Sequence, residues 1–323
     1  MIVDRRTLMI VDCFPYFDKI NHKILDLRIN LLKDYVDYFI ISEANQTHSG
    51  EDIEPNLPQR LKNLNIDKSK IIYEQVDLKN IEPSEIDLYN CNGIENITES
   101  SIRARTRERL QRDSLLNHLD RFSDNDIFIV SDADEIINPE HINWIANTIN
   151  NNDLSRRVLK IPLVHLEGRA DLRVYVNQQP MSWDKSMFIC QKKHLTQSTP
   201  TQIRSNIFSG FAVDYLSEDG LKIEDLGWHF SWMGSGEDRL IKTKSFIHNN
   251  EIMHNRTKNF SSEDHMNLLA SEPEENRMPP SAIKGSILKK YDVDKLPKII
   301  LDNDNIRSFL LPNYHAKKYV NYY

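Results

Sequence analysis

The first half of the chain alternates short apolar runs with longer segments of helical spacing. The apolar runs predict strands at Thr7–Val11, Tyr38–Ser42, Ile71–Val76 and Asp126–Ser131. The segments with apolar residues three and four positions apart predict helices at Ile20–Val36, Pro58–Leu64 and Ser101–Phe122. Regular alternation of strand and helix is typical of parallel strands joined by crossover helices. The pattern therefore predicts an α/β fold, a Rossmann-like α/β/α sandwich with a mostly parallel central sheet.

The pattern is weaker after Asn150. It predicts short strands at Val158–Val164, Arg173–Val176 and Ser186–Cys190, and a helix at Arg239–Asn249. From Ser261 the chain becomes polar and is interrupted by prolines, as in a loop or lid. We therefore expect one domain over residues 1–260, with halves at 1–150 and 151–260, and a C-terminal extension over 261–323 packed on it.

Composition and charge narrow the class of protein. The hydrophobic fraction of 39% and the charged fraction of 28% are those of a globular chain, which excludes disorder, collagen and coiled coil. A net charge of −7 argues against a general nucleic-acid binder. No apolar run approaches the ~20 residues of a membrane span, and the N-terminus does not resemble a signal peptide. The widely spaced Cys13, Cys91 and Cys190 predict neither a disulfide framework nor a zinc knuckle, which favours a reducing compartment.

Three acids follow the fourth predicted strand directly. In the segment IFIVSDADEI, Asp132, Asp134 and Glu135 come immediately after a buried strand. Ligands of open α/β sheets bind beyond the carboxyl ends of the strands. Clustered carboxylates repel one another unless a cation lies between them, and Mg²⁺ or Mn²⁺ prefers oxygen ligands. The segment therefore predicts a divalent-cation site, and the alternative is an acidic turn that precedes a helix beginning at Pro139.

A stripe of arginines lies on the inward face of the predicted helix 101–122. At about 100° per residue, Arg109 and Arg112 lie within about 40° of Arg105, on the face that carries the aliphatic residues. An inward guanidinium needs an anion. That anion is either a structural acid such as Asp113 or Glu43, or the diphosphate of a ligand. We favour Arg112 for the diphosphate, because it lies nearest the middle of the helix.

The aromatic segment GWHFSW, residues 227–232, combines a histidine with two tryptophans. His229 is a candidate metal ligand beside the carboxylates, and Trp228 offers a flat face for a sugar ring. Taken alone, the segment favours the alternative, a core strand with a buried histidine. Downstream, Glu237 and Asp238 lie in a glycine-flanked loop and are candidate general bases. Asp184 and Asp225 compete with them for that role, and no spacing rule selects among the four.

These segments together resemble glycosyltransferase family 17, whose members include the bisecting β-1,4-mannosyl-glycoprotein 4-β-N-acetylglucosaminyltransferase. The resemblance begins at VDCFPYFDKINHKILDLRINLL, with its Asp26-Leu27-Arg28 step. It continues through VDYFIISEANQTHSG, the QRD of the long helix, IFIVSDADEI, and GWHFSW followed by KSFIH. The motifs keep their order over about residues 8–250.

The resemblance implies a GT-A fold and a metal-dependent inverting transfer of a sugar from a nucleotide-diphosphate donor to a glycan hydroxyl. The best candidate donor is UDP-N-acetylglucosamine, with Mn²⁺ or Mg²⁺ as cofactor. Donor binding then falls in residues 1–150, and acceptor binding in 151–260. Asp132 lies near the ribose or metal, Asp134 ligates the metal, and Glu43 contacts the nucleoside. His229 is a metal ligand, with His248 as its competitor; Arg109, Arg112 and Trp228 complete the expected donor contacts.

The expected partners are a nucleotide-sugar donor and a carbohydrate acceptor, with no nucleic acid. The family's animal members carry a membrane anchor and a stem that we do not recognise here. We therefore expect a microbial or viral cytoplasmic enzyme, with peripheral contact at the inner membrane face allowed, and no oligomeric state is predicted. Two other functions stay open: a metal-dependent phosphatase or phosphotransferase, and a non-catalytic sugar-binding module of the same fold.

Overall fold

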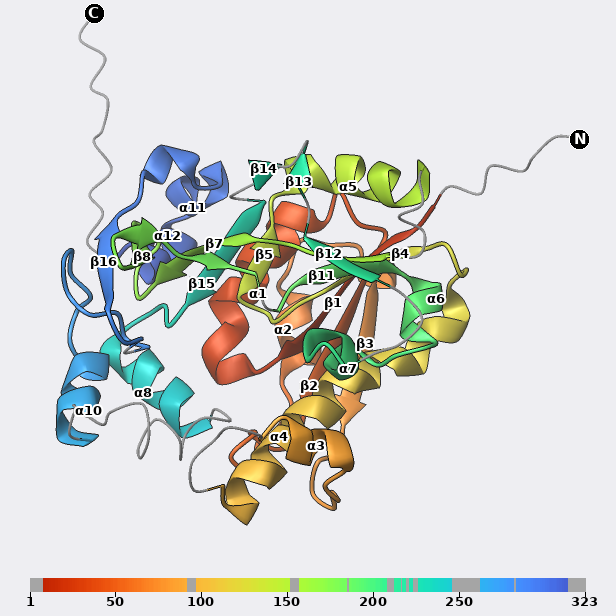
Figure 1. The fold of residues 1–323 in the computed structure, drawn as a ribbon, viewed down its shortest axis with the longest axis horizontal. Helices are drawn as coiled ribbons and strands as arrows, with labels where there is room; N and C mark the ends of the chain where they lie inside the picture. The colour runs from red at the N-terminus through yellow and green to blue at the C-terminus, as the bar shows by residue number, and fades with distance from the viewer. Residues whose placement is uncertain are drawn as a thin grey trace, which may run out of the picture.

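The computed structural model describes residues 8–91, 97–151, 157–184, 186–207, 212–215, 217–218, 221–222, 226–245, 262–281 and 283–312. Two seven-stranded sheets organise these residues (Figure 1). The central sheet has the strand order β12-β6-β11-β4-β1-β2-β3. Its strands are β1 (Ile10–Tyr16), β2 (Tyr38–Ala44), β3 (Ile71–Val76), β4 (Ile127–Val130), β6 (Arg157–Lys160), β11 (Phe188–Gln191) and β12 (Ala212–Tyr215). All neighbours are parallel except β11, which is antiparallel to β4 and β6, so the mostly parallel sheet is confirmed.

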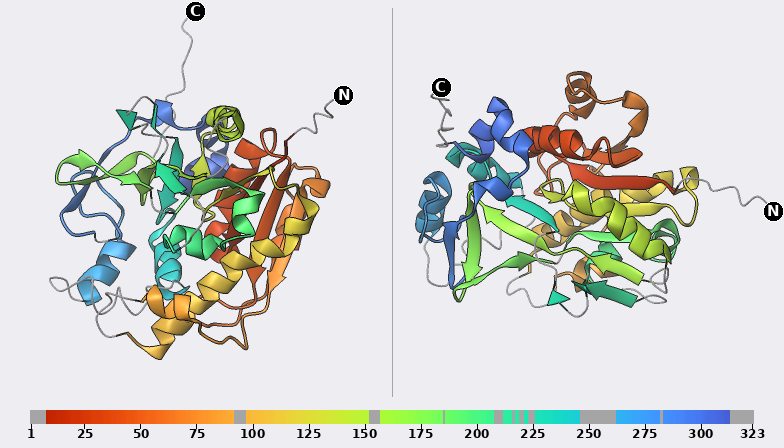
Figure 2. Two further views of the ribbon diagram at one scale, coloured as in Figure 1. Left: turned by 45° about the vertical axis from the view of Figure 1, so that its right-hand side comes forward. Right: turned by 90° about the horizontal axis from the view of Figure 1, so that it is seen from above.

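Helices cover both faces of this sheet because alternate residues of each strand point to opposite faces. Ile10 and Phe14 of β1 face one apolar core, and Val11 and Cys13 face the other. The first core is closed by α1 (Asp18–Leu32), α2 (Leu57–Lys62) and α5 (Pro139–Asn151). The second is closed by the 3₁₀ helix η2 (Ser114–Arg121), α6 (Lys192–Leu195) and α7 (Pro200–Arg204). The resulting α/β/α sandwich, visible in Figure 2, is the predicted fold class.

The strand order reverses between β1 and β4. The first three strands run β1-β2-β3 outward from the middle to one edge, and the chain then crosses to the other side of β1 to form β4. Such a reversal leaves a crevice outside the carboxyl ends of the two strands, and ligands of open α/β sheets bind there. Tyr16 and Ser131 mark those two ends, so the acidic segment 132–135 begins at the crevice.

The second sheet corrects one predicted strand. The predicted strand 158–164 is two strands in different sheets, β6 and β7 (Leu163–Glu167), because Pro162 cannot donate to a ladder and the chain turns there. The second sheet has the order β16-β8-β7-β15-β5, with β10 on β7 and β9 on β8. Its strands are β5 (Glu135–Ile137), β8 (Leu172–Val176), β9 (Gln179–Pro180), β10 (Ser182–Trp183), β15 (Gly227–Ser231) and β16 (Ser286–Lys290).

Two predicted helices differ in length from the observed ones. The helix predicted at 101–122 is α4 (Glu99–Asp113) followed by η2, and Ser114 Oγ donates to the Gln111 carbonyl at 2.9 Å where α4 ends. The helix predicted at 239–249 is α8 (Gly236–Ser245), and residues 246–249 lie outside the described part of the chain. The remaining elements are η1 (Lys68–Lys70), α3 (Glu85–Tyr89), β13 (Ser217–Glu218), β14 (Leu221–Lys222) and η4 (Val293–Lys295).

The described residues after position 261 add a strand to the second sheet and helices that pack on α8 and α1. α10 (Ser262–Ala270) contacts α8, β16 pairs with β8, and α11 (Lys298–Asp302) and α12 (Asp304–Leu310) contact α1. A boundary at residue 260 stays a prediction.

The segment 273–281 is fastened to the end of β7. The fully buried Glu167 carboxylate accepts hydrogen bonds from Ser281 N and, at 2.9 Å, from Ser281 Oγ. Gly168 has φ +75°, and a Cβ at this position would collide with Pro273. Both features hold the segment against the second sheet.

Candidate active site

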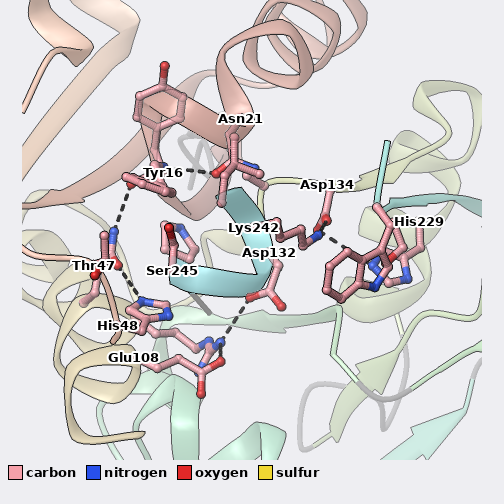
Figure 3. A pocket seen from close by; sticks show the side chains of 18 of the residues that line it. Tyr16, Asn21, Thr47, His48, Glu108, Asp132, Asp134, His229, Lys242 and Ser245 are labelled. Atoms are coloured by element: carbon pink, nitrogen blue, oxygen red, sulfur yellow. Dashed lines mark hydrogen bonds and ion pairs between the residues drawn. The ribbon is translucent and has the colours of Figure 1, made fainter. Parts of the chain in front are cut away.

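A cavity of about 690 Å³ lies outside the carboxyl ends of β1, β2 and β4. It is lined by the residues after these strands, by α4, α7 and α8, by β15, and by Ser281, Ile283 and Lys284. Figure 3 shows Asp132 and Asp134 inside it, with Lys242 reaching Asp134 from α8 and Glu108 and His48 lying on another side. Its size is that of typical small-molecule sites, and its position is that expected for a ligand of an open α/β sheet.

Asp132 is held between two arginines. Arg204 Nη1 lies 2.7 Å from each carboxylate oxygen of Asp132, and Arg112 Nη2 lies 3.1 Å from Oδ1. Burial alone would raise the pKa of Asp132, but the two guanidinium groups outweigh it and hold that pKa well below its usual range. Asp132 is therefore ionised and is already matched by protein cations.

Asp134 lies between a lysine and a histidine. Lys242 Nζ is 2.9 Å from Asp134 Oδ2, and His229 Nε2 is 3.8 Å from Asp134 Oδ1. Burial opposes ionisation, but Lys242 and His229 lower the pKa of Asp134 below its usual value. Burial also lowers the pKa of His229 to about 4, so this imidazole is neutral near pH 7. Its ring packs against both Trp183 and His165, at centroid distances of 4.4 Å and 4.9 Å, and those two rings contact each other at 5.2 Å.

The third acid of the loop, Glu135, serves a different purpose from the other two. Its carboxylate accepts hydrogen bonds from Trp183 Nε1 at 2.6 Å and from the Asp132 amide at 3.0 Å. It is fully buried, and burial together with the charge of Asp132 raises its pKa to about 7. Glu135 therefore fixes the indole of Trp183, which lines the cavity, while it does not itself line it.

Arg28 on α1 fixes the backbone of the acidic loop. Its guanidinium forms a bidentate pair with Asp12 of β1, with Nε–Oδ2 at 2.7 Å and Nη2–Oδ1 at 2.6 Å, and both side chains are fully buried. Nη1 donates to the carbonyls of Asp132 at 2.9 Å and Glu135 at 2.7 Å. The arginine of the predicted Asp26-Leu27-Arg28 motif thus sets the path of the loop that carries the acids.

The opposite wall of the cavity is polar and is fixed by Gln111. The Gln111 amide nitrogen donates to the Tyr16 and Ser42 carbonyls, each at 3.1 Å, which ties the ends of β1 and β2 to α4. Its oxygen lies 2.9 Å from His48 Nε2. Glu108 lies on the same wall and pairs with Arg112 at 2.8 Å. This wall offers side chains suited to hydroxyl and base edges of a nucleoside.

The side chains that line the cavity carry more positive than negative charge. The described residues that line the cavity include four cationic side chains, Arg112, Arg204, Lys242 and Lys284, and three carboxylates, Glu108, Asp132 and Asp134. Burial lowers the pKa of each lining histidine, His48, His165 and His229, so these add no charge near pH 7. A cavity with more cations than carboxylates favours an anionic ligand.

Of the nine side chains predicted from sequence for the site, four line the cavity: Arg112, Asp132, Asp134 and His229. Glu43 does not: its carboxylate accepts from the Asn56 and Leu57 amides at 2.9 Å each, at the start of α2. Arg109 pairs with the buried Asp87 of α3 at 2.8 Å, which makes it a structural pair. Trp228 is buried against Phe230 at a centroid distance of 6.5 Å.

The two predicted bases also lie away from the cavity lining. Glu237 is exposed in the first turn of α8, and Asp238 Oδ2 accepts hydrogen bonds from Ser235 N and Oγ at 2.7 Å each. Of their two competitors, Asp184 does not line the cavity and Asp225 falls outside the described residues. His248, the competitor of His229 as a metal ligand, also falls outside the described residues.

Four residues of the site carried no usable sequence signal. Arg204 lies in a segment for which no structure was predicted, and Trp183 lies in a strand of only two residues. Lys242 is one of the two lysines on α8, and His48 follows β2 in an otherwise polar loop. Only an expectation that every buried carboxylate needs a cation would have prompted a search for Arg204 and Lys242.

Part of the donor set fits a divalent cation. Asp134 and His229 present an oxygen and a neutral imidazole nitrogen to each other, and His229 Nδ1 is buried without a hydrogen-bond partner among the described residues. No cluster of three or more acids, histidines or cysteines arranged to hold a metal occurs in the described part of the chain. Mg²⁺ and Mn²⁺ are commonly bound through one or two protein ligands plus substrate phosphates, so Asp134 and His229 fit this chemistry, while Asp132 is engaged by arginines.

Replacing Glu108 with glutamine is expected to reduce the acid sensitivity of folding. Burial raises the pKa of Glu108, but Arg112 and Arg204 outweigh it and lower that pKa to about 2, against an ordinary value of 4.5. Because the folded-state pKa is depressed, the stabilisation is present above pH 4.5 and is lost as the pH falls toward 2. Thermal unfolding of both proteins should show a wild-type advantage at pH 7 that shrinks at pH 3. An advantage that is equal at both pH values would contradict this account.

The strand-order reversal and the cationic cavity with its acidic loop together form a candidate active site of an open α/β sheet. Residues 15–159 match the family model described as glycosyltransferase family 17, which confirms the resemblance over that segment. Together with the α/β/α architecture, the match agrees with the GT-A-type fold that the resemblance implied. A search of curated proteins finds no significant match.

Several solved structures match part of the chain at low similarity. A mycobacterial protein matches with 14% identity over 69% of this chain and 66% of its own, just under two thirds, at a TM-score of 0.35. Glucosyl-3-phosphoglycerate synthase from Mycobacterium tuberculosis, in complex with phosphoglyceric acid, matches with 14% identity over 69% of this chain and 71% of its own at a TM-score of 0.33. The galactosyltransferase LgtC, in complex with donor and acceptor sugar analogs, matches with 14% identity over 64% of this chain and 73% of its own at a TM-score of 0.32.

No helix in the described part of the chain combines the length and the apolar character that crossing a membrane requires.

Proposed function

We propose that the protein is an inverting glycosyltransferase, assisted by a divalent cation, that moves a sugar from a uridine-diphosphate donor to a glycan hydroxyl. N-acetylglucosamine is the first candidate for the sugar, as the resemblance to family 17 implies. The observation that carries the proposal is the convergence of Arg112, Arg204 and Lys242 on the acidic loop at the strand-order reversal. Three cationic side chains at this position, of which Arg112 is buried and Arg204 and Lys242 are partly buried, suit the diphosphate of a nucleotide sugar.

Different residues of the cavity contact different parts of the proposed donor, according to their chemistry. The polar wall of Thr47, His48 and Glu108 receives the nucleoside. Arg112 and Arg204 grip the diphosphate, and they neutralise the charge that grows on it as the bond to the sugar breaks. Asp134 and His229 would hold the cation, which, when bound, supplies further Lewis-acid stabilisation of the same charge. Trp183, fixed by Glu135, offers an aromatic face beside the transferred sugar.

The proposal assigns no role to the predicted bases. Glu237 and Asp238 do not line the cavity, and the Asp238 carboxylate is engaged by Ser235. The identity of the base, the acceptor and the cytoplasmic location stay predictions from the sequence.

The phosphatase alternative lacks a nucleophile on the first strand. That class needs an accessible aspartate after β1, whereas Asp12 is fully buried within β1 and forms the bidentate pair with Arg28. A carboxylate in such a pair is unavailable for attack on a phosphate ester. This observation favours glycosyl transfer.

A thermal-shift screen tests the proposed donor. UDP, UDP-N-acetylglucosamine and UDP-glucose, each with and without Mn²⁺, should raise the melting temperature, because a ligand that binds only the folded state stabilises it. ADP-glucose serves as the matched control and should produce a smaller shift. Donor hydrolysis, followed as UDP release, should then appear in the samples with Mn²⁺. Equal shifts for uridine and adenine nucleotides, or none for either, would overturn the assignment of a uridine-diphosphate donor.

A further inference from the structure

Lys242 forms an ion pair with the carboxylate of Asp134, which is the candidate ligand of the divalent cation. Its Nζ lies 2.9 Å from Asp134 Oδ2, and its side chain is 15% exposed. The ammonium also lies 5.4 Å from the centroid of the Trp232 ring. Both Lys242 and Asp134 line the cavity, as Figure 3 shows. The contact is therefore an ion pair inside the proposed donor site.

The ion pair matches the buried carboxylate of Asp134 with a positive charge. Asp134 is 12% exposed in its side chain, and an ionised carboxylate at such a depth is costly without a cation beside it. Arg112 and Arg204 are engaged with Asp132, so they do not serve Asp134. His229 Nε2 lies farther from this carboxylate, 3.8 Å from Asp134 Oδ1. Among the described contacts, Lys242 is thus the cationic group nearest to Asp134, at 2.9 Å.

A divalent cation and the ammonium cannot share Asp134 at their contact distances. The like charges would lie within a few ångströms of each other in a partly buried site, where their repulsion is large. The lysine is the partner that can move, because its charge stands on a flexible four-carbon stem. The Arg112 and Arg204 guanidiniums, by contrast, are held by Asp132. Metal binding at Asp134 therefore requires the ammonium to leave for the open cavity.

We propose that Lys242 is a built-in competitor of the divalent cation at Asp134, and that the displaced ammonium becomes a ligand of the donor diphosphate. This inference rests on the proposed function, because it needs both the cation and the diphosphate. Displacement of Lys242 would make the binding of the divalent cation and the binding of the donor diphosphate cooperative. The cation releases Lys242 for the diphosphate, and the diphosphate gives the displaced ammonium a new partner, so each strengthens the binding of the other.

Direct measurement of Mn²⁺ binding tests the competition without an activity assay. Electron paramagnetic resonance of free Mn²⁺, or calorimetry, gives the affinity for the protein alone and with UDP present. Lys242→Met should bind Mn²⁺ alone about tenfold more tightly than the wild type, because the competing charge is gone. UDP should strengthen Mn²⁺ binding to the wild type more than to Lys242→Met. Lys244 is exposed and lies two residues further along α8. The control variant Lys244→Met should therefore match the wild type in Mn²⁺ affinity, both alone and with UDP.

The outcomes separate this inference from the proposed function. Unchanged or weaker Mn²⁺ binding by Lys242→Met would overturn the competition, even if the wild type binds UDP and hydrolyses the donor. Equal Mn²⁺ binding by the wild type and Asp134→Asn would overturn it as well, because the cation would then bind elsewhere. Lys242→Gln, which keeps a polar end without the charge, should also bind Mn²⁺ more tightly, and it replaces Lys242→Met if that variant fails to fold. Failure of every uridine nucleotide to bind the wild type would instead refute the proposed function.

Discussion

Asp134→Asn is expected to lower the turnover of sugar transfer by about 10²–10³-fold while the protein remains folded. The substitution keeps the size of the side chain but removes the charge that faces Lys242 and His229. The cation then loses its carboxylate, and the leaving diphosphate loses the stabilisation that the cation supplies. Release of UDP from the donor in the presence of Mn²⁺ measures the rate, and circular dichroism verifies the fold.

A surface aspartate provides the matched control for this prediction. Asp124→Asn removes a carboxylate that is 72% exposed and pairs only with Lys192 among the contacts described. Its turnover should equal that of the wild type. A folded Asp134→Asn enzyme with undiminished turnover would refute the role of this carboxylate and, with it, the cation site at the acidic loop.

Arg28→Met should destabilise the fold by about 3–5 kcal/mol. Methionine fills similar space, but it leaves the Asp12 carboxylate buried without its partner. It also leaves the carbonyls of Asp132 and Glu135 without the donor that now reaches them. Urea unfolding followed by circular dichroism measures the loss. Because the same guanidinium fixes the acidic loop, donor binding should weaken even under conditions in which the variant is folded.

Two further variants separate the buried pair from an ordinary ion pair. Arg103→Met removes an arginine that is 39% exposed and pairs with Glu99 one turn earlier on α4, and the expected change is below about 0.5 kcal/mol. Combining Asp12→Asn with Arg28→Met should recover part of the loss, because no unpaired charge remains. Recovery to wild-type stability would show that the hydrogen bonds from Arg28 to the loop carbonyls contribute little.

The first half of the fold was predictable because its signal is local. The residues of β4 are apolar without interruption and are all buried, which is the pattern of a strand covered on both faces. The acids that follow it had to lie at the carboxyl end of a parallel strand, and they do. The strands of the second sheet were harder to predict, because they are short and the break at Pro162 divides one apolar run between two sheets.

For the arginines of α4, helical spacing predicted the face on which they lie but not the acids with which they pair. Spacing placed Arg109 and Arg112 together on the inward face, and both are indeed directed at acids. The spacing did not predict which acid would pair with Arg109 and which with Arg112. Asp87, the partner of Arg109, belongs to a short helix between β3 and α4 that carried no predicted structure. Partner choice depends on tertiary position, which a single helix does not encode.

Glu43 illustrates a second limit of the same kind. The resemblance to family 17 implied that Glu43, at the end of the second strand, contacts the nucleoside. In the structure, its carboxylate accepts the first free amides of α2, where a negative charge is favourable. A strand-end acid close to a following helix has two available partners, and the distance in sequence to Asn56 did not reveal which one it would take.

The attachment of Ser281 to Glu167 has a consequence for exchanging parts between related enzymes. Ser281, Ile283 and Lys284 line the cavity, yet their position depends on a carboxylate and a glycine at the end of β7, more than a hundred residues earlier in the chain. A chimera that imports the 273–284 segment alone would deliver new side chains on a misplaced backbone. Residues 167 and 168 must travel with the segment for its specificity to be inherited.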